Sequence, residues 1–270
     1  QVPEGNALLN SLSDAIHAGY RLIDTASIYG NERAVGIAMR NSGVPRSDFF
    51  LVDKVWNADR GYEKTLEAFR KSTALLGTSY LDLYMIHWPA THEEPITCQA
   101  INAGTWRALE KLYPDGSVRA IGVSNFYPDR FIDLAEFCEI TPAVNQVETH
   151  VFNQQIKLQE VMKEYGTKIM SWGPFAEGRN DFFTNPTLQE IGKEYGKSVA
   201  QVALRYLIQR DIIVIPKSTH KERMIENFNV FDFSLTPDDM AAIAALDTAK
   251  TLFFSHYDPE MVKWLINYGK

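Results

Sequence analysis

The sequence predicts an α/β protein built as a nearly complete (β/α)8 TIM barrel. Seven short apolar runs alternate with stretches of helical periodicity, and a helix precedes the first run. Several of the runs are apolar almost throughout, as expected of parallel strands buried on both faces. The chain has 270 residues, and a barrel of this type has roughly 250. Length and pattern therefore favour a barrel.

The elements follow in order along the chain. Strands are expected at residues 21–26, 49–55, 81–88, 118–125, 142–148, 168–173 and 211–217. Helices are expected at residues 5–19, 31–42, 62–77, 101–113, 128–138, 154–166, 187–194, 198–209, 221–227 and 234–246. The last helix has the clearest start, with Thr236 as N-cap, Pro237 at the first position and two aspartates in the first turn. Long loops are expected at residues 89–100 and 175–186, and a tail after residue 247.

An open, doubly wound sheet is the alternative architecture, and alternation of strands and helices alone does not exclude it. No Gly-x-Gly-x-x-Gly loop follows an early strand, which weakens the dinucleotide-binding version of that fold. No linker, low-complexity run or longer repeat is seen. We therefore expect residues 1–270 to form a single domain.

Composition excludes several classes of function. The net charge of -7 and the pI near 5.4 argue against binding to nucleic acid or to an anionic membrane. No apolar stretch is long enough to span a bilayer, and the first residues, QVPEGN, show no secretory signal. Two cysteines are too few for a disulfide framework. We expect a cytoplasmic monomer that needs no metal.

Four residues at or just past predicted strand ends carry most of the chemical information. They are Asp24, Tyr29, Lys54 and His87, in the segments RLIDTASIYGNE, LVDKVW and LDLYMIHWP. A lysine beside a phenol lowers the pKa of the phenol, and an aspartate keeps the lysine charged and in place. Such a tyrosine suits general-acid catalysis. Taken singly, the four could be a turn residue, a half-buried aromatic, a solvated charge and a core histidine.

Further polar and aromatic residues lie at the remaining strand ends. In a barrel the carboxyl ends of the strands converge on the active site. Capping and turn chemistry explains some of these residues, but polar groups at the end of every strand point to a site. The residues are Asn125, Gln146, Trp172 and Lys217.

At this point the chain resembles the aldo-keto reductases. The segments DTASIYGNE, LVDKVW, IHWP, GVSNF, VNQVE and IPKSTHKERMIENF match motifs of that family in order and approximate spacing. The likeness covers nearly the whole chain. The bacterial and plant-like branch near the 2,5-diketo-D-gluconate reductases is the most similar, because Trp172 stands where other branches have tyrosine.

The resemblance implies NADP(H) as cofactor and a role for each motif. Asp24, Tyr29, Lys54 and His87 would form a catalytic tetrad, with Tyr29 as proton donor. Three residues would hold the nicotinamide carboxamide, namely Ser124, Asn125 and Gln146, and Trp172 would stack on the nicotinamide ring. The 2′-phosphate would be bound by Lys217, Ser218 and Arg223. Glu226 and Asn227 would lie near the adenine.

The chemistry of the residues agrees with these implied roles. Ser, Asn and Gln side chains match the donors and acceptor of a carboxamide. Two cations within six residues at a helix start, Lys217 and Arg223, suit a dianionic phosphate, although a solvated basic turn is the alternative.

The chain also departs from the family pattern. The family's first strand and N-terminal hairpin precede the point where this sequence starts, so we expect the barrel to lack its first strand. Gly173 stands where relatives commonly carry serine, so contacts of the cofactor loop are expected to differ there.

The leading hypothesis is an NADPH-dependent carbonyl reductase acting on aldehydes, small dicarbonyls or keto sugars. Two alternatives stay open. One is a Schiff-base lyase that uses Lys54 as nucleophile. The other is a non-catalytic NADPH-binding subunit of a larger assembly.

Overall fold

A parallel sheet forms the centre of the molecule in the computed structural model, which describes residues 2–89 and 95–268. Within this part of the chain the sheet has seven strands, and their order in space is their order in sequence. The strands are β1 (Leu22–Asp24), β2 (Phe50–Val55), β3 (Leu83–Ile86), β4 (Ile121–Ser124), β5 (Val144–Glu148), β6 (Lys168–Trp172) and β7 (Ile213–Val214). Every predicted strand is confirmed, and each is shorter than its apolar run.

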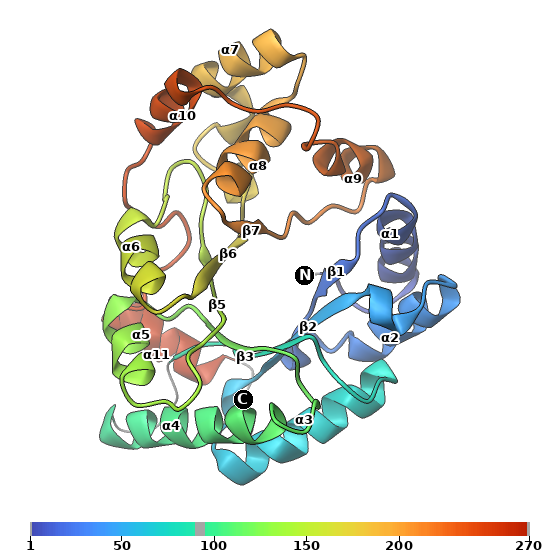
Figure 1. Ribbon diagram of the computed structural model, residues 1–270, viewed down its shortest axis with the longest axis vertical. Coiled ribbons are helices and arrows are strands. Elements are labelled where there is room, and N and C mark those ends of the chain that lie inside the picture. Colours follow the sequence, from blue (N-terminus) through green and yellow to red (C-terminus); the bar gives the residue numbers. More distant parts are fainter. Residues whose placement is uncertain (1, 90–94, 269–270) are drawn as a thin grey trace.

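The sheet curls around a common axis with helices on its outer side (Figure 1). Strands β1 and β7 are its two edges and do not pair with each other in the described part of the chain. The prediction of a (β/α)8 barrel that lacks its first strand is therefore confirmed, and the open, doubly wound alternative is set aside.

Alternating side chains of each strand face inward and outward. A small cluster of Val52, Leu83, Met85, Val144 and Met170 fills the inside of the curled sheet. A larger cluster joins the outer faces of the strands to the helices, through residues such as Leu51 and Tyr84. Because strand side chains alternate, Lys54 lies on the same inner face as Val52. Burial on both faces explains why several of the strands are apolar almost throughout.

The helices cover the outer face of the sheet, and a helix lies near each end of the chain. They are α1 (Asn6–His17), α2 (Glu32–Asn41), α3 (Tyr62–Leu76), α4 (Pro95–Leu112), α5 (Pro128–Ala135), α6 (Ile156–Glu164), α7 (Pro186–Tyr195), α8 (Val199–Gln209), α9 (Lys221–Phe228), α10 (Pro237–Ala244) and α11 (Pro259–Asn267). The predicted start of α10 is confirmed. Thr236 caps it, with Pro237 in the first turn, and Thr236 and Asp239 bond each other in a capping box.

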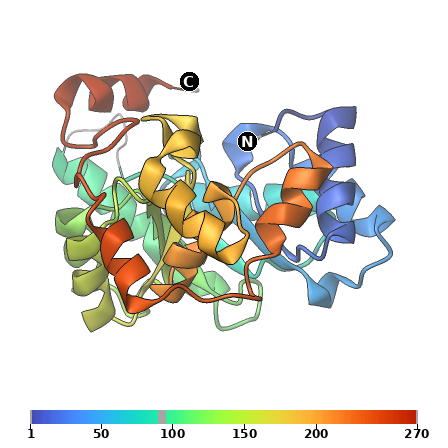
Figure 2. The ribbon, with the colours of Figure 1, turned by 90° about the horizontal axis from the view of Figure 1, so that it is seen from above.

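Two elements differ from prediction. Helix α4 begins at Pro95, inside the segment 89–100 that was expected to be a loop, and residues 90–94 of that loop lie outside the described residues. Helix α11 lies in the tail after residue 247, for which no helix was predicted. Its Leu265 packs on Trp56 and Trp88, which follow β2 and β3, so α11 covers the carboxyl end of the sheet (Figure 2).

The second expected loop, residues 175–186, is organised by two short 3₁₀ turns, Ala176–Gly178 and Phe182–Thr184. Phe182 is fully buried beneath it. The described helices include none that combines the length and apolarity needed to traverse a membrane.

Candidate active site

The site is centred on a buried ion pair between β1 and β2. Lys54 is fully buried, and its Nζ donates to both carboxylate oxygens of Asp24 at 2.8 and 2.7 Å and to the backbone carbonyl of Thr25 at 2.9 Å. Asp24 ends β1, and the parallel register sets it beside Val52, two residues before Lys54 on the same face. Three acceptors thus hold one ammonium group in a fixed position inside the barrel.

Tyr29 and His87 lie beside this pair. Tyr29 ends a single 3₁₀ turn, Ser27–Tyr29, which closes at Gly30 in the left-handed region with φ 61°. Lys54 Nζ lies 5.6 Å from the centre of the Tyr29 ring. The His87 ring, directly after β3, meets the Tyr29 ring edge-on at 5.7 Å. The structure therefore brings together all four residues that the strand-end pattern singled out.

The pKa of Tyr29 differs from the sequence expectation. Burial raises the pKa of this phenol, Lys54 lowers it, and Asp24 and Asp53 raise it again, so the net pKa lies above the ordinary value of 10.0. The expected net lowering is wrong, although Lys54 acts in the expected direction. Sequence reasoning counted the cation but not the cost of burying a phenolate. Tyr29 is consequently protonated at neutral pH and can donate its proton.

The pKa values of the neighbouring groups fix their charges. Burial would lower the pKa of Lys54, but Asp24 and Tyr29 together raise it above its ordinary value, so the lysine is a cation. Burial and the Lys54 charge both lower the pKa of His87 well below 6.5, so its imidazole is neutral. His87 Nδ1 is buried and has no hydrogen-bond partner among the described residues. A neutral imidazole still carries one N–H that can donate.

Ser124, Asn125 and Gln146 form a connected polar group at the end of β4 and in the middle of β5. Ser124 Oγ donates to the backbone carbonyl of Gln146 at 2.9 Å, and Asn125 Nδ2 donates to Ser124 Oγ at 3.1 Å and to the backbone carbonyl of His87 at 3.2 Å. Gln146 Nε2 donates to Asp24 Oδ1 at 2.7 Å. The set is therefore continuous with the ion pair.

Trp172 ends β6 and connects this group to the C-terminal tail. Its Nε1 donates to Asn125 Oδ1 at 2.9 Å. Its ring lies against Phe253 at 5.2 Å and is stacked with Phe254 at 5.9 Å. Gly173 has φ 63°, a conformation that a serine rarely adopts, which gives a physical reason for glycine here.

The predicted phosphate-binding residues lie after β7 and on α9. Lys217 and Arg223 are exposed, as a site for a charged ligand requires. Ser218 Oγ accepts from the His220 backbone at 3.0 Å. The Glu226 carboxylate accepts from Ser198 Oγ at the start of α8, a contact that the sequence did not predict. Asn227 is buried.

Sequence reasoning missed the aromatic residues around His87. Trp56 and Trp88 are buried, and their rings lie 5.2 and 5.7 Å from the His87 ring. Phe254, far away in sequence, packs on the same cluster. Trp56 directly follows one predicted strand and Trp88 is the last residue of another, and this position was a usable signal. No local sequence pattern around Phe254 predicts its contact with this cluster.

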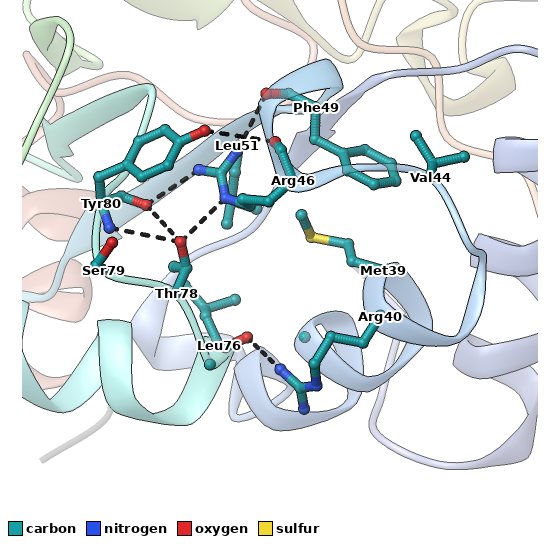
Figure 3. Close-up of a pocket in the computed structure, with 12 residues that line it drawn as sticks. Met39, Arg40, Val44, Arg46, Phe49, Leu51, Leu76, Thr78, Ser79 and Tyr80 are labelled. Atoms are coloured by element: carbon teal, nitrogen blue, oxygen red, sulfur yellow. Dashed lines mark hydrogen bonds between the residues drawn. The ribbon is translucent and has the colours of Figure 1, made fainter.

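A cavity of about 280 Å³ lies at the opposite end of β2 (Figure 3). Phe49 and Leu51 line it at the start of the strand, whereas Lys54 lies near its end. Arg46 beside it is bonded to Thr78, Phe49 and Tyr80 (Figure 3). The cavity is no part of the site described above. Within the described residues, no group of three or more His, Cys, Asp or Glu side chains could hold a metal ion.

Comparison with known proteins adds independent evidence. The model of the Aldo/keto reductase family matches residues 4–248. The chain is 48% identical to the 9,11-endoperoxide prostaglandin H2 reductase of Trypanosoma cruzi and 46% identical to the glyoxal reductase of Bacillus subtilis, each over 92% of this chain and 86% of the relative. An aldo-keto reductase, MGS-M4, from a deep-sea metagenome has a similar structure, with a TM-score of 0.89 and 42% identity over 94% of this chain and 92% of that one. The structure of a Bombyx mori aldo-keto reductase in complex with NADP is also similar, with a TM-score of 0.81 and 33% sequence identity over 93% of this chain and 87% of that one.

Proposed function

The chain belongs to the aldo/keto reductase family, and from that premise we propose that it reduces aldehydes, small dicarbonyls or keto sugars with NADPH, using Tyr29 as proton donor. The observation that supports this most is the grouping of a protonated phenol, a buried lysine and a neutral imidazole at the carboxyl end of the sheet. Together they can protonate a carbonyl oxygen and stabilise the charge that develops on it.

The residues present suit NADP(H). Ser124, Asn125 and Gln146 would hold the nicotinamide carboxamide; Asn125 donates to Ser124, and Ser124 donates to the backbone carbonyl of Gln146. Trp172 would hold the ring, and the exposed Lys217 and Arg223 would bind the 2′-phosphate. Ser218, Glu226 and Asn227 would complete the adenosine end, and a carboxylate that accepts one bond from Ser198 can accept further bonds. When bound, the reduced cofactor supplies the hydride.

The protein's own groups handle the proton. Tyr29 Oη gives its proton to the carbonyl oxygen, and the phenolate left behind is stabilised by the Lys54 charge until solvent reprotonates it. His87 donates a hydrogen bond that orients the carbonyl and stabilises negative charge on its oxygen. Asp24 keeps Lys54 in place.

The two alternatives have less support. A Schiff-base lyase needs an unprotonated lysine, but Lys54 is held as a cation by Asp24, Tyr29 and a backbone carbonyl. A non-catalytic subunit would not need the complete group of Asp24, Tyr29, Lys54 and His87.

The test is oxidation of NADPH by the protein with a panel of aldehydes, dicarbonyls and keto sugars, compared with Tyr29→Phe. The variant should lose about 10²–10⁴-fold in kcat, because it lacks only the acidic hydroxyl, and NADPH affinity should stay within a few-fold. No turnover of any carbonyl by the wild-type protein would refute the proposal. A Tyr29→Phe protein with more than about a tenth of wild-type kcat would refute the role of Tyr29.

A further inference from the structure

A buried carboxylate at the end of β5 holds the C-terminal tail. Glu148 is the last residue of the strand and is buried. Its Oε1 accepts from the backbone N–H of Leu252 at 2.9 Å, and its other oxygen accepts from Thr251 Oγ1. The two partners lie more than a hundred residues further along the chain. Glu148 therefore joins the barrel wall directly to the tail.

His150 completes the environment of this carboxylate. Its Nδ1 accepts from the Phe152 backbone N–H at 3.2 Å, which leaves the proton on Nε2, and Nε2 lies 2.9 Å from Glu148 Oε1. Burial raises the pKa of Glu148, but the bonds from His150, Thr251 and Leu252 lower it below its ordinary value. Glu148 is thus an ionised acceptor with three donors, and bonds to a charged acceptor are strong.

Thr251 connects Glu148 to two aromatic residues through hydrogen bonds. Its Oγ1 gives its own hydrogen to Glu148 and accepts from the backbone N–H groups of Phe253 at 3.0 Å and Phe254 at 3.1 Å. The hydroxyl therefore fixes the backbone of both phenylalanines. We call Glu148 and Thr251 the latch.

The phenylalanines held by the latch connect two parts of the candidate site. Phe254 is stacked on Trp172 at 5.9 Å and meets Trp88 edge-on at 6.3 Å, next to His87. Phe253 meets the Trp172 ring edge-on at 5.2 Å. A carbonyl bound at Tyr29 and His87 would have its attached group beside this aromatic surface.

We propose that the latch determines substrate specificity by fixing Phe254 as the wall that receives a flat, apolar group attached to the carbonyl. This rests on the proposed function. Aromatic aldehydes would use the wall, whereas a small dicarbonyl such as glyoxal would not reach it. Glu148 and Thr251 are positioning residues, because their side-chain hydrogen bonds among the described residues go to His150 and to the tail and not to Tyr29, Lys54 or His87.

The tail has a second attachment, so the latch can be removed without releasing it. Thr248 donates from both its backbone N–H and its Oγ1 to the Phe152 carbonyl, at 2.9 and 2.8 Å. Thr251 itself is only partly buried. Thr251→Val, which keeps the shape and removes the hydroxyl, should therefore fold, and Thr251→Ser is the matched control that keeps the hydroxyl.

The experiment measures KM and kcat for benzaldehyde and for glyoxal in wild type, Thr251→Val and Thr251→Ser. An aromatic contact contributes enough for its loss to raise KM for benzaldehyde roughly 2- to 12-fold in Thr251→Val. Glyoxal kinetics should stay within about two-fold of wild type, and Thr251→Ser should resemble wild type for both. Equal effects on the two substrates, or none on either, would overturn the proposal.

A second measurement keeps this result separate from failure of the proposed function. Tryptophan emission attributable to Trp172, obtained by difference from Trp172→Phe, should shift to the red in Thr251→Val because Phe253 and Phe254 no longer cover the indole. This readout needs no turnover. If wild type reduces no carbonyl, the proposed function fails. An unshifted emission spectrum would refute the proposed role of the latch, whether or not the protein is active.

Discussion

At the scale of single residues, the buried charge of Lys54 organises the site. Replacing it by Met removes the cation that opposes the other influences on the Tyr29 pKa, so that pKa should rise further. We expect Lys54→Met to lose about 10²-fold or more in kcat, and the basic limb of any residual pH–rate profile to move to higher pH.

The matched control for this prediction is Lys168→Met. Lys168 is also on a strand, but it is exposed and pairs with Asp211 at the surface. The kcat of the Lys168→Met variant should stay within about two-fold of the wild-type value, because surface substitutions away from a site have small effects. An unchanged pH–rate profile in a weakly active Lys54 variant would contradict the coupling between Lys54 and Tyr29.

Arg223 carries the prediction about cofactor choice. If it binds the 2′-phosphate, Arg223→Ala should weaken NADPH binding by roughly one to two decades, since hydrogen bonds to charged groups are worth about 1.5–3 kcal/mol. NADH, which has no such phosphate, should bind the variant and wild type equally. Quenching of tryptophan fluorescence gives both dissociation constants, with Arg70→Ala on α3 as an exposed control. Equal weakening of both cofactors would make Arg223 a structural residue.

At the scale of elements, α2 and α3 are in contact at Gly36. A Cβ added there would lie 2.6 Å from the carbonyl carbon of Leu76, which belongs to the backbone and cannot turn aside. Gly36→Ala should therefore force the helices apart and lower the free energy of unfolding by about 1–3 kcal/mol.

Gly104 in α4 is the matched control for Gly36. A Cβ there would meet the Tyr62 nitrogen at 3.5 Å, an ordinary contact. Gly104→Ala should leave the free energy of unfolding unchanged or raise it by up to about 1 kcal/mol, because alanine is the better helix former. Urea denaturation separates the two outcomes. Equal effects of the two substitutions would show that the approach of α2 to α3 does not depend on Gly36.

Element boundaries show where local sequence signals are sufficient. The start of α10 could be predicted because Thr236, Pro237 and Asp239 are all local capping signals. Helix α11 could not, because its main apolar contact is Leu265 with two tryptophans about two hundred residues away. Packing across the molecule decides such an element more than its own residues do.

At the scale of the whole molecule, buried histidines link stability to pH. Burial lowers the pKa of His256 from 6.5 to about 4, and neither ring nitrogen has a hydrogen-bond partner among the described residues. The unfolded chain binds a proton near pH 6.5 and the native chain does not. Stability from this group is therefore present above pH 6.5 and is lost as pH falls toward 4, by about 3 kcal/mol in total.

The measurement is the free energy of unfolding between pH 7 and 4.5 for wild type and His256→Phe. The free energy of unfolding should depend less steeply on pH in the variant, by about 1.4 kcal/mol per pH unit, which is the contribution of one proton. His87 contributes in the same direction and remains in both proteins. The exposed His17→Asn serves as a control. An identical slope in wild type and His256→Phe would show that His256 is not buried in its neutral form.

Some expectations about the whole molecule stay predictions. We propose that residues 1–270 act as one domain and as a monomer in the cytoplasm. Sedimentation of the purified protein, and localisation of a tagged chain, would test the last two points.

The sequence by itself determined which residues are available for chemistry and in what order the strands follow. Periodicity set the strands and most helices, and residues at strand ends identified Asp24, Tyr29, Lys54 and His87, because parallel strands bring their carboxyl ends together. Only the tertiary structure decided the raised pKa of Tyr29, the contact of Glu226 with Ser198 and the attachment of the tail to Glu148. Each of these depends on burial or on partners distant in sequence, and neither is encoded in a local pattern.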